Sequence, residues 1–401
     1  MGRRTATTRT AALLAAMTLS LAACAESDDG GGGGGGGGSA DETGPIKIGA
    51  VLDITGAGAS LGVPERQALE LLAGQLEEEG GIDGREVELI IEDNQSTEDG
   101  AAKAMNKLVN EDEVDIVLGA SRTGPSLAMR PIAESTETPM ISLAANQAIV
   151  EGSEWVFKTA QNDRVVIERM IDYMAEQGWS TIGLARDASG FGEGVAEMFD
   201  EIGAEQGISV VATEKFAPDA TDFTAQMVNL RNAGADVNVI WGIPPAAGLA
   251  QRAYDQLGIE TPVMQSHGIG NQVFLDTAGD AAEGMVAPLG RLVVAEQLPD
   301  DDPQKEIITT FIDDYTAEFG AGPSTFSGHA YDAWQLAVDA LSEEGTDPQA
   351  IRDHLESVTD FTGISGVFTM TPEDHAGLSK EALALVTVEN GQWQLVPDQG
   401  D

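Results

Sequence analysis

The stretch IKIGAVLDITGAGASLG, residues 46–62, decides the fold. It begins with an apolar run of strand length, Ile48–Leu52, and continues as a turn of small residues that leads into a helical pattern at Arg66–Leu76. A strand, a tight turn and a helix form the repeating unit of a sheet whose strands are joined by helices. Because similar units recur along the chain, the sequence predicts an α/β protein.

The alternation of strands and helices falls into two series, with a break near Thr159. Since helix-length segments separate the short strands, neighbouring strands should be parallel and joined by right-handed crossovers. Two series predict two doubly wound lobes, and a chain of 401 residues is long enough to fill both. The expected strands are Ile48–Leu52, Val87–Ile91, Ile116–Leu118 and Met140–Leu143, then Ile182–Ala185, Ser209–Ala212, Val237–Trp241 and Val263–Met264.

The C-terminal part contains too few strands for a third lobe. Helices near Gln304–Glu318, Ala330–Leu341 and Pro348–Val358 precede short strand patterns at Val367–Met370, Ala384–Val388 and Gln392–Val396. We expect these strands to complete the two sheets, so that a multi-crossing hinge joins the lobes. The predicted N-terminal lobe is residues 46–160 with about 288–365, and the predicted C-terminal lobe is residues 161–287 with about 366–397.

The N-terminal segment has the pattern of a secretory signal, with Arg3, Arg4 and Arg9 ahead of an apolar run that is too short to span a membrane. The run ends in Leu-Ala-Ala-Cys, residues 21–24, which resembles the lipobox of bacterial lipoproteins. That resemblance implies a signal peptide at residues 1–23 and a lipid on the Cys24 thiol. Residues 24–45, which include nine consecutive glycines, would be a tether. The pair Arg3-Arg4 leaves twin-arginine export open.

Composition argues against several classes of function. Sixty-seven acidic and 21 basic residues give a net charge of −46, which repels nucleic acid and anionic lipid headgroups. The four histidines lack metal-ligand spacing, and Cys24 is the sole cysteine. The glycines at 56, 58 and 62 miss the dinucleotide-binding spacing by one residue, and no nucleophile with its base is apparent. We therefore expect a non-enzymatic protein without metal, cofactor or nucleic-acid partner.

Several motifs occur in an order that points to one family. IKIGAVLDITG (46–56), GGIDGR (80–85), VLGAS (117–121), PMISLAAN (139–146) and WVFKT (155–159) resemble motifs of the leucine/isoleucine/valine-binding family of type I periplasmic binding proteins. GFGEG (190–194), DFTA (222–225) and GDAAEGM (279–285) continue the resemblance, which extends from about residue 46 to 396. Each motif alone is weak, but their number and order are specific.

The resemblance implies a monomer that acts outside the cytoplasm, attached to the membrane only through the Cys24 lipid. It also implies three linkers between lobes that close on a small-molecule ligand, and delivery to ABC permease subunits with cytoplasmic ATPases. By position, the family's carboxylate contacts fall on Thr123, with its neighbour Gly124, and on Ala144, Ala145 and Asn146. The facing and flanking positions of the pocket are Ser60, Leu61 and Phe326 in the first lobe and Phe191, Ile243 and His267 in the second.

Four residues near this pocket have two interpretations or depart from the family pattern. His267 stands where amino-acid-binding members have an acid for the ligand's ammonium, so either the ligand lacks an ammonium or another acid such as Asp187 pairs with it. Asp187 is alternatively a cap for the segment after its strand. Arg122 is a candidate for binding a ligand carboxylate or for pairing with a neighbouring acid. Asp163, just before a predicted helix, is expected to be its N-cap.

The predicted function is a solute-binding lipoprotein of an ABC importer, with a small branched-chain-type amino acid or related carboxylate as ligand. An ammonium-free acid, a short amide or urea is the alternative ligand. The alternative from another class is a tethered sensor that works without a transporter.

Overall fold

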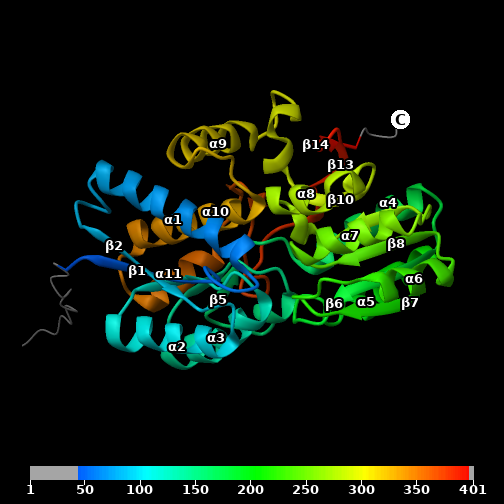
Figure 1. The fold of residues 1–401 in the computed structure, drawn as a ribbon. Coiled ribbons are helices and arrows are strands. Elements are labelled where there is room, and N and C mark those ends of the chain that lie inside the picture. The colour runs from blue at the N-terminus through cyan, green and yellow to red at the C-terminus, as the bar shows by residue number, and fades with distance from the viewer. Residues whose placement is uncertain (1–43, 397–401) are drawn as a thin grey trace, which may run out of the picture. The chain divides into compact units, whose positions relative to one another are not determined.

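The computed structural model of the protein describes residues 44–396 (Figure 1). The predicted signal peptide, the Cys24 lipidation site and almost all of the tether lie outside the described residues. Within residues 44–396, no helix is long and apolar enough to cross a membrane.

The first lobe is built on a five-stranded parallel sheet of order β2-β1-β3-β4-β5. Successive residues of β1 point to opposite faces, so Ala50 and Leu52 belong to the apolar cluster with α1 and α10, whereas Val51 belongs to the cluster with α2 and α3. The strands are β1 Ile46–Leu52, β2 Val87–Asp93, β3 Ile116–Gly119, β4 Met140–Ser142 and β5 Val156–Lys158, and the helices are α1 Ala59–Glu79, α2 Glu98–Lys107, α3 Thr123–Thr136, α10 Thr325–Glu344 and α11 Pro348–Glu356.

The second lobe is built on a seven-stranded sheet of order β14-β13-β10-β9-β8-β6-β7. Its strands β6 to β10 are parallel, and β13 and β14 are antiparallel to their neighbours. The predicted fold class, two doubly wound α/β lobes, is confirmed. The strands are β6 Thr181–Asp187, β7 Ser209–Phe216, β8 Val237–Trp241, β9 Val263–Gln265, β10 Val286–Gly290, β13 Leu383–Glu389 and β14 Gln392–Leu395, and the helices are α4 Asp163–Glu176, α5 Val195–Gly203, α6 Thr224–Ala233, α7 Ala246–Gln256 and α8 Gln272–Ala278.

The C-terminal strands differ from the prediction that they complete both sheets. β13 and β14 both join the second sheet, whereas β11 (Phe361–Thr362) and β12 (Val367–Phe368) form a separate antiparallel pair. The reason is the turn between β13 and β14, where Asn390 and Gly391 have φ values of 52° and 72°. A two-residue Asn-Gly loop with positive φ at both positions makes a tight hairpin, so β14 must lie beside β13. β10, Val286–Gly290, was not predicted as a strand, and it spans residue 288, where the predicted N-terminal lobe resumes.

The chain passes between the lobes three times: between β5 and α4, between β10 and α10, and between β12 and β13. The intervening α9, Lys305–Phe319, contacts α1. Hydrogen bonds hold the passages together, since Thr159 Oγ1 donates to the His329 carbonyl at 2.8 Å and Gln161 Nε2 donates to the Ser365 carbonyl at 2.8 Å. The first passage is therefore anchored to α10 and to the segment leading into the third.

Candidate functional site

A cavity of about 870 Å³ opens where the strand ends of the two sheets face each other. In open α/β sheets, ligands bind outside the carboxyl ends of parallel strands, so this is the expected position for a binding site. Ser60 and Asn146 do not line the cavity. The other predicted pocket residues do: Leu61, Arg122, Thr123, Gly124, Ala144, Ala145, Asp187, Phe191, Ile243, His267 and Phe326.

The first-lobe wall includes the N-terminus of α3, which begins at Thr123 directly after β3 and its turn. The N–H groups of a first helical turn have no partners within the helix, and the Arg122 side chain does not cap them. The Thr123 hydroxyl also makes no hydrogen bond with any described residue. Free N–H groups, a hydroxyl and the positive end of the helix dipole together suit a ligand carboxylate.

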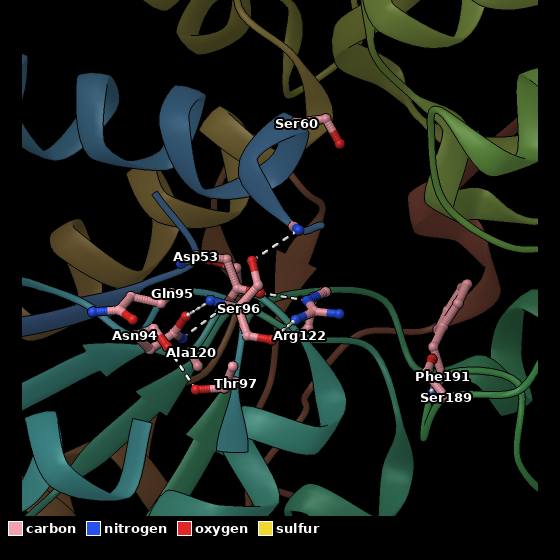
Figure 2. A network of polar contacts seen from close by, with 12 residues as sticks. Asp53, Ser60, Asn94, Gln95, Ser96, Thr97, Ala120, Arg122, Ser189 and Phe191 are labelled. Atoms are coloured by element: carbon pink, nitrogen blue, oxygen red, sulfur yellow. Dashed lines mark hydrogen bonds and ion pairs between the residues drawn. The ribbon is translucent and has the colours of Figure 1, made fainter. Parts of the chain in front are cut away.

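Arg122 is held by a buried ion pair. Its Nε donates to Asp53 Oδ2 and its Nη2 donates to the Ser96 carbonyl at 2.5 Å, on the first-lobe side of Figure 2. Asp53 is fully buried and also accepts from Asn94 Nδ2 at 2.7 Å. Of the two interpretations of Arg122, the structure shows the pairing with a neighbouring acid, with the acid fully buried and the guanidinium partly so. The same side chain still forms part of the cavity wall.

A lysine lies beneath the first-lobe binding turn. Lys158 is fully buried at the end of β5, and its ammonium donates to the backbone carbonyl of Ala145. Burial lowers the pKa of Lys158 to about 8, while the charge of Asp163 opposes that shift. The first-lobe half of the cavity therefore has a cationic residue below it as well as a helix N-terminus beside it.

The second-lobe wall is largely aromatic. The ring centroid of Phe191 lies 5.5 Å from that of Trp241 and 5.5 Å from that of His267, and Trp241 Nε1 donates to the Phe191 carbonyl at 3.1 Å. Ile243 lines the cavity beside them, and Phe326 of α10 lines it from the first lobe. These rings and the alkyl side chain provide an apolar surface for the body of a ligand.

His267 contributes its ring to the cavity wall, but neither ring nitrogen is accessible or hydrogen-bonded to a described residue. Its Nε2 lies 3.9 Å from Asp163 Oδ1. Burial lowers the pKa of His267 to about 3, with Lys158 and His329 adding to the effect, so the imidazole is neutral at physiological pH.

The predicted N-cap role of Asp163 is wrong. The N-cap position of α4 is Asn162, whose backbone is extended, and Asp163 is the first helical residue. Asp163 is fully buried, and neither of its carboxylate oxygens is hydrogen-bonded to a described residue. Burial raises the pKa of Asp163 to about 7; Lys158 opposes this shift and Asp187 adds to it.

Asp187 ends β6 and lines the cavity with 1% of its surface exposed. Its Oδ1 accepts two hydrogen bonds from Ser189, from the backbone N–H at 2.9 Å and from the hydroxyl at 2.6 Å. Burial raises the pKa of Asp187, whereas the bonds from Ser189 and the charge of Arg122 oppose that shift. Asp187 thus orders the next turn and also lines the cavity, so the geometry fits both of its interpretations.

Ser60 and Asn146 bridge the lobes at the edge of the cavity. Ser60 Oγ donates to the Pro244 carbonyl at 2.9 Å, and Asn146 Nδ2 donates to the Gly190 carbonyl at 3.1 Å. Gly190 comes so close to the first lobe that a Cβ on it would lie 3.1 Å from Thr123 Cγ2. The lobes are therefore in a closed arrangement.

Sequence reasoning missed several residues of the wall. They share a position just after the end of a strand, or in a helix that packs against one, and this position is the signal that could have identified them. They are Ser121, Leu143, Ala160, Ser189 and His329. Among residues 44–396, no group of three or more His, Cys, Asp or Glu side chains is arranged to hold a metal ion.

Comparison with known proteins gives a consistent result. A family model described as "Periplasmic binding protein" matches residues 45–392. The leucine-, isoleucine-, valine-, threonine-, and alanine-binding protein of Pseudomonas aeruginosa is 28% identical over 318 residues, which cover 78% of this chain and 83% of that protein.

Solved structures show the same fold. An extracellular ligand-binding receptor from Rhodopseudomonas palustris HaA2 aligns with a TM-score of 0.82 at 27% identity, covering 88% of this chain and 99% of that one. The branched-chain amino acid transporter substrate binding protein of Streptococcus pneumoniae, solved in complex with isoleucine, aligns with a TM-score of 0.76 at 24% identity, covering 88% and 99% of the two chains.

Proposed function

Because the chain belongs to the family of periplasmic binding proteins, it is an extracytoplasmic solute-binding protein and not an enzyme, and we propose that its ligand is a small amino acid of the branched-chain type. The two lobes would close on this ligand and present it to the permease subunits of an ABC importer. The observation that carries the proposal is the pairing, across one cavity, of the uncapped N-terminus of α3 with an apolar wall.

The first-lobe half of the cavity suits the ligand's carboxylate. Backbone N–H groups at Thr123 and Gly124, with the Thr123 hydroxyl, would donate hydrogen bonds to the carboxylate oxygens. Lys158 beneath Ala145 would add to the positive potential on this side. An anion that enters here replaces water at groups that the protein itself leaves without partners.

The apolar half suits a branched alkyl side chain. Leu61, Phe191, Ile243 and Phe326 converge on the cavity from both lobes. Full burial of a side chain of leucine size contributes about 1.5–3 kcal/mol, which favours leucine, isoleucine and valine over polar amino acids. The printed name of the Pseudomonas aeruginosa relative includes the same three amino acids and supports this choice.

An ammonium-free carboxylate is the second candidate, and His267 is the observation that favours it. A neutral imidazole whose two nitrogens are both buried offers no negative charge to a ligand ammonium at this position. A compound with only a carboxylate and an apolar body would use the same two halves of the cavity.

Attachment to the membrane is part of the proposal. Cys24 would carry the lipid, and residues 25–45 would let the lobes reach the permease. The lobe boundaries suggested by the sequence, 46–160 with about 288–365 and 161–287 with about 366–397, are likewise retained as a proposal.

A thermal-shift screen tests the proposed ligand class, because a ligand that binds only the folded state raises its stability by about 2.7 kcal/mol at 100 times its Kd. We expect leucine, isoleucine or valine to raise the Tm, with aspartate, lysine and glucose as controls that do not. Aromatic acids, short amides and urea complete the panel. A shift with one of these three groups and none with any branched-chain amino acid would contradict the proposal.

A further inference from the structure

A zwitterionic ligand needs an anion for its ammonium, because an unpaired cation in a closed cavity is strongly unfavourable. His267 lines this cavity but is neutral, so it cannot supply that anion. The acid that takes over this role determines whether the protein distinguishes an amino acid from the corresponding simple acid. This question rests on the function proposed above and concerns the same cavity.

The acidic residues near the cavity differ in how far they are buried and in whether they reach the cavity. Glu98, Asp99 and Glu193 line it but are exposed residues, so water would screen their charges from a bound ligand. Asp163 is buried, but it does not line the cavity and both of its oxygens are enclosed. Among the acids that line this cavity in the part of the chain that the structure describes, only Asp187 is buried.

The two carboxylate oxygens of Asp187 have different surroundings. Oδ1 accepts both hydrogen bonds from Ser189. Oδ2 makes no hydrogen bond of normal geometry with any described residue, although the Gly192 N–H is near enough to the carboxylate to help lower its pKa. Since Oδ2 is also not among the enclosed, unpartnered atoms, it keeps a small exposed surface at the cavity that Asp187 lines. The turn to Ser189 thus fixes the direction of the carboxylate and leaves one oxygen available to a ligand.

The position of the Asp187 loop also fits an α-amino acid. An α-ammonium and an α-carboxylate are bonded to the same carbon, so their two binding groups must be close neighbours. Gly190, three residues after Asp187, approaches Thr123 at the start of α3, where the carboxylate is expected. Figure 2 shows Ser189 and Phe191 of this loop on the side of the cleft opposite Arg122.

We propose that Asp187 is the specificity-determining residue that pairs with the ligand's α-ammonium through Oδ2. The raised pKa of Asp187 is consistent with a buried carboxylate that lacks a sufficient partner until the ligand arrives. The protein then selects zwitterionic amino acids over acids of the same shape that lack the ammonium.

Two compounds that differ only in the ammonium test this inference: leucine and 4-methylpentanoate. Affinities would be measured by calorimetry for wild type, Asp187→Asn, Ser189→Ala and Asp163→Asn. We expect wild type to prefer leucine, and Asp187→Asn to weaken leucine binding by about 10- to 150-fold while 4-methylpentanoate binding changes by no more than about threefold. Asp187→Ser, which is also uncharged, should behave in the same way and replaces Asp187→Asn if that variant does not fold.

The control variants separate charge pairing from a structural role. Asp163→Asn removes the enclosed acid and should retain the full preference for leucine. Ser189→Ala keeps the carboxylate but removes the hydroxyl bond that helps to fix its direction, so it should lose less of the preference than Asp187→Asn does. Equal binding of the two compounds by wild type, or loss of the preference in Asp163→Asn but not in Asp187→Asn, would overturn this inference alone. Wild type that binds neither compound would contradict the proposed function together with it.

Discussion

The side-chain amide of Asn146 donates a 3.1 Å hydrogen bond to the backbone carbonyl of Gly190 and so joins the binding turn of the first lobe to the facing loop of the second. Because this bond joins the two lobes, it exists only while they are closed. Its net contribution, about 0.5–1.5 kcal/mol, therefore favours the closed state that holds the ligand.

Asn146→Ala should weaken binding of the ligand by about 2- to 13-fold through the lost bond to Gly190. The variant also removes the 2.9 Å bond that Asn146 Oδ1 accepts from the Ala148 N–H, so the stability of the first lobe should fall slightly. Calorimetry measures the affinity, and small-angle X-ray scattering measures the radius of gyration of the ligand-free protein, which should increase. Asn110→Ala is the matched control, since the Asn110 amide bonds only to Asn106 on the exposed face of its own helix. Equal affinities of the Asn146 variant and wild type would show that this bond does not contribute to closure.

Thr123→Ala should weaken binding by about 1–3 kcal/mol, because a buried ligand oxygen would lose its hydroxyl partner. Thr123→Ser keeps the hydroxyl and should recover most of the affinity. Thr213→Ala, an exposed threonine on β7, serves as the control. If the alanine and serine variants of Thr123 bind equally well, the hydroxyl is not a ligand contact.

Asp163 should make the stability of the protein depend on pH. Burial raises its pKa to about 7, compared with about 3.9 in an unfolded chain, so the folded state binds this proton more tightly. The resulting stabilisation is fully present below about pH 4 and is lost as the pH rises through 7. Asp163→Asn resembles the protonated acid, so its free energy of unfolding should rise relative to that of wild type as the pH increases from 4 to 8. The rise should be smaller than the pKa of Asp163 alone would give, because the buried Lys158 loses its partner in this variant.

Urea unfolding at several pH values between 4 and 8 measures this difference. The surface variant Asp301→Asn is the control, and the difference between its free energy of unfolding and that of wild type should not increase as the pH rises through 7. A difference between Asp163→Asn and wild type that stays constant across this range would mean that Asp163 is ionised throughout.

Cys24→Ser should abolish lipid attachment and the cleavage that precedes residue 24, because the thiol is the group that is alkylated in the lipoprotein pattern of residues 21–24. Metabolic labelling with a palmitate analogue in the producing cell measures the lipid, and the mass of the protein reports cleavage. Ser20→Ala, inside the apolar run, is the control that should keep both. Equal labelling of Cys24→Ser and wild type would remove Cys24 as the anchor.

The sequence predicted those features of the fold that depend on local pattern. Leu61, Thr123 and Ala144 follow the apolar strands β1, β3 and β4, which are adjacent in the sheet, and these residues line one cavity. The C-terminal strands were harder to assign because their pattern does not specify a partner sheet. Only the Asn390-Gly391 hairpin, with positive φ at both residues, requires β14 to lie beside β13.

Details of the site depended on contacts between residues far apart in the chain. Arg122 pairs with Asp53, which lies 69 positions away, and a sequence pattern cannot show that this carboxylate is buried beside the guanidinium. Asn162 takes the N-cap position that was expected for Asp163, because α4 already begins at Asp163. The burial of both His267 ring nitrogens likewise follows from tertiary packing.

Titration of leucine into the purified protein by calorimetry tests the central claim most directly, namely that the cleft binds a small branched-chain-type amino acid. We predict saturable binding of one leucine per chain, with isoleucine and valine competing for the same site, and a marked loss of affinity in Thr123→Ala. A folded protein that shows no heat of binding with any of the three amino acids, and no displacement of one by another, would contradict it.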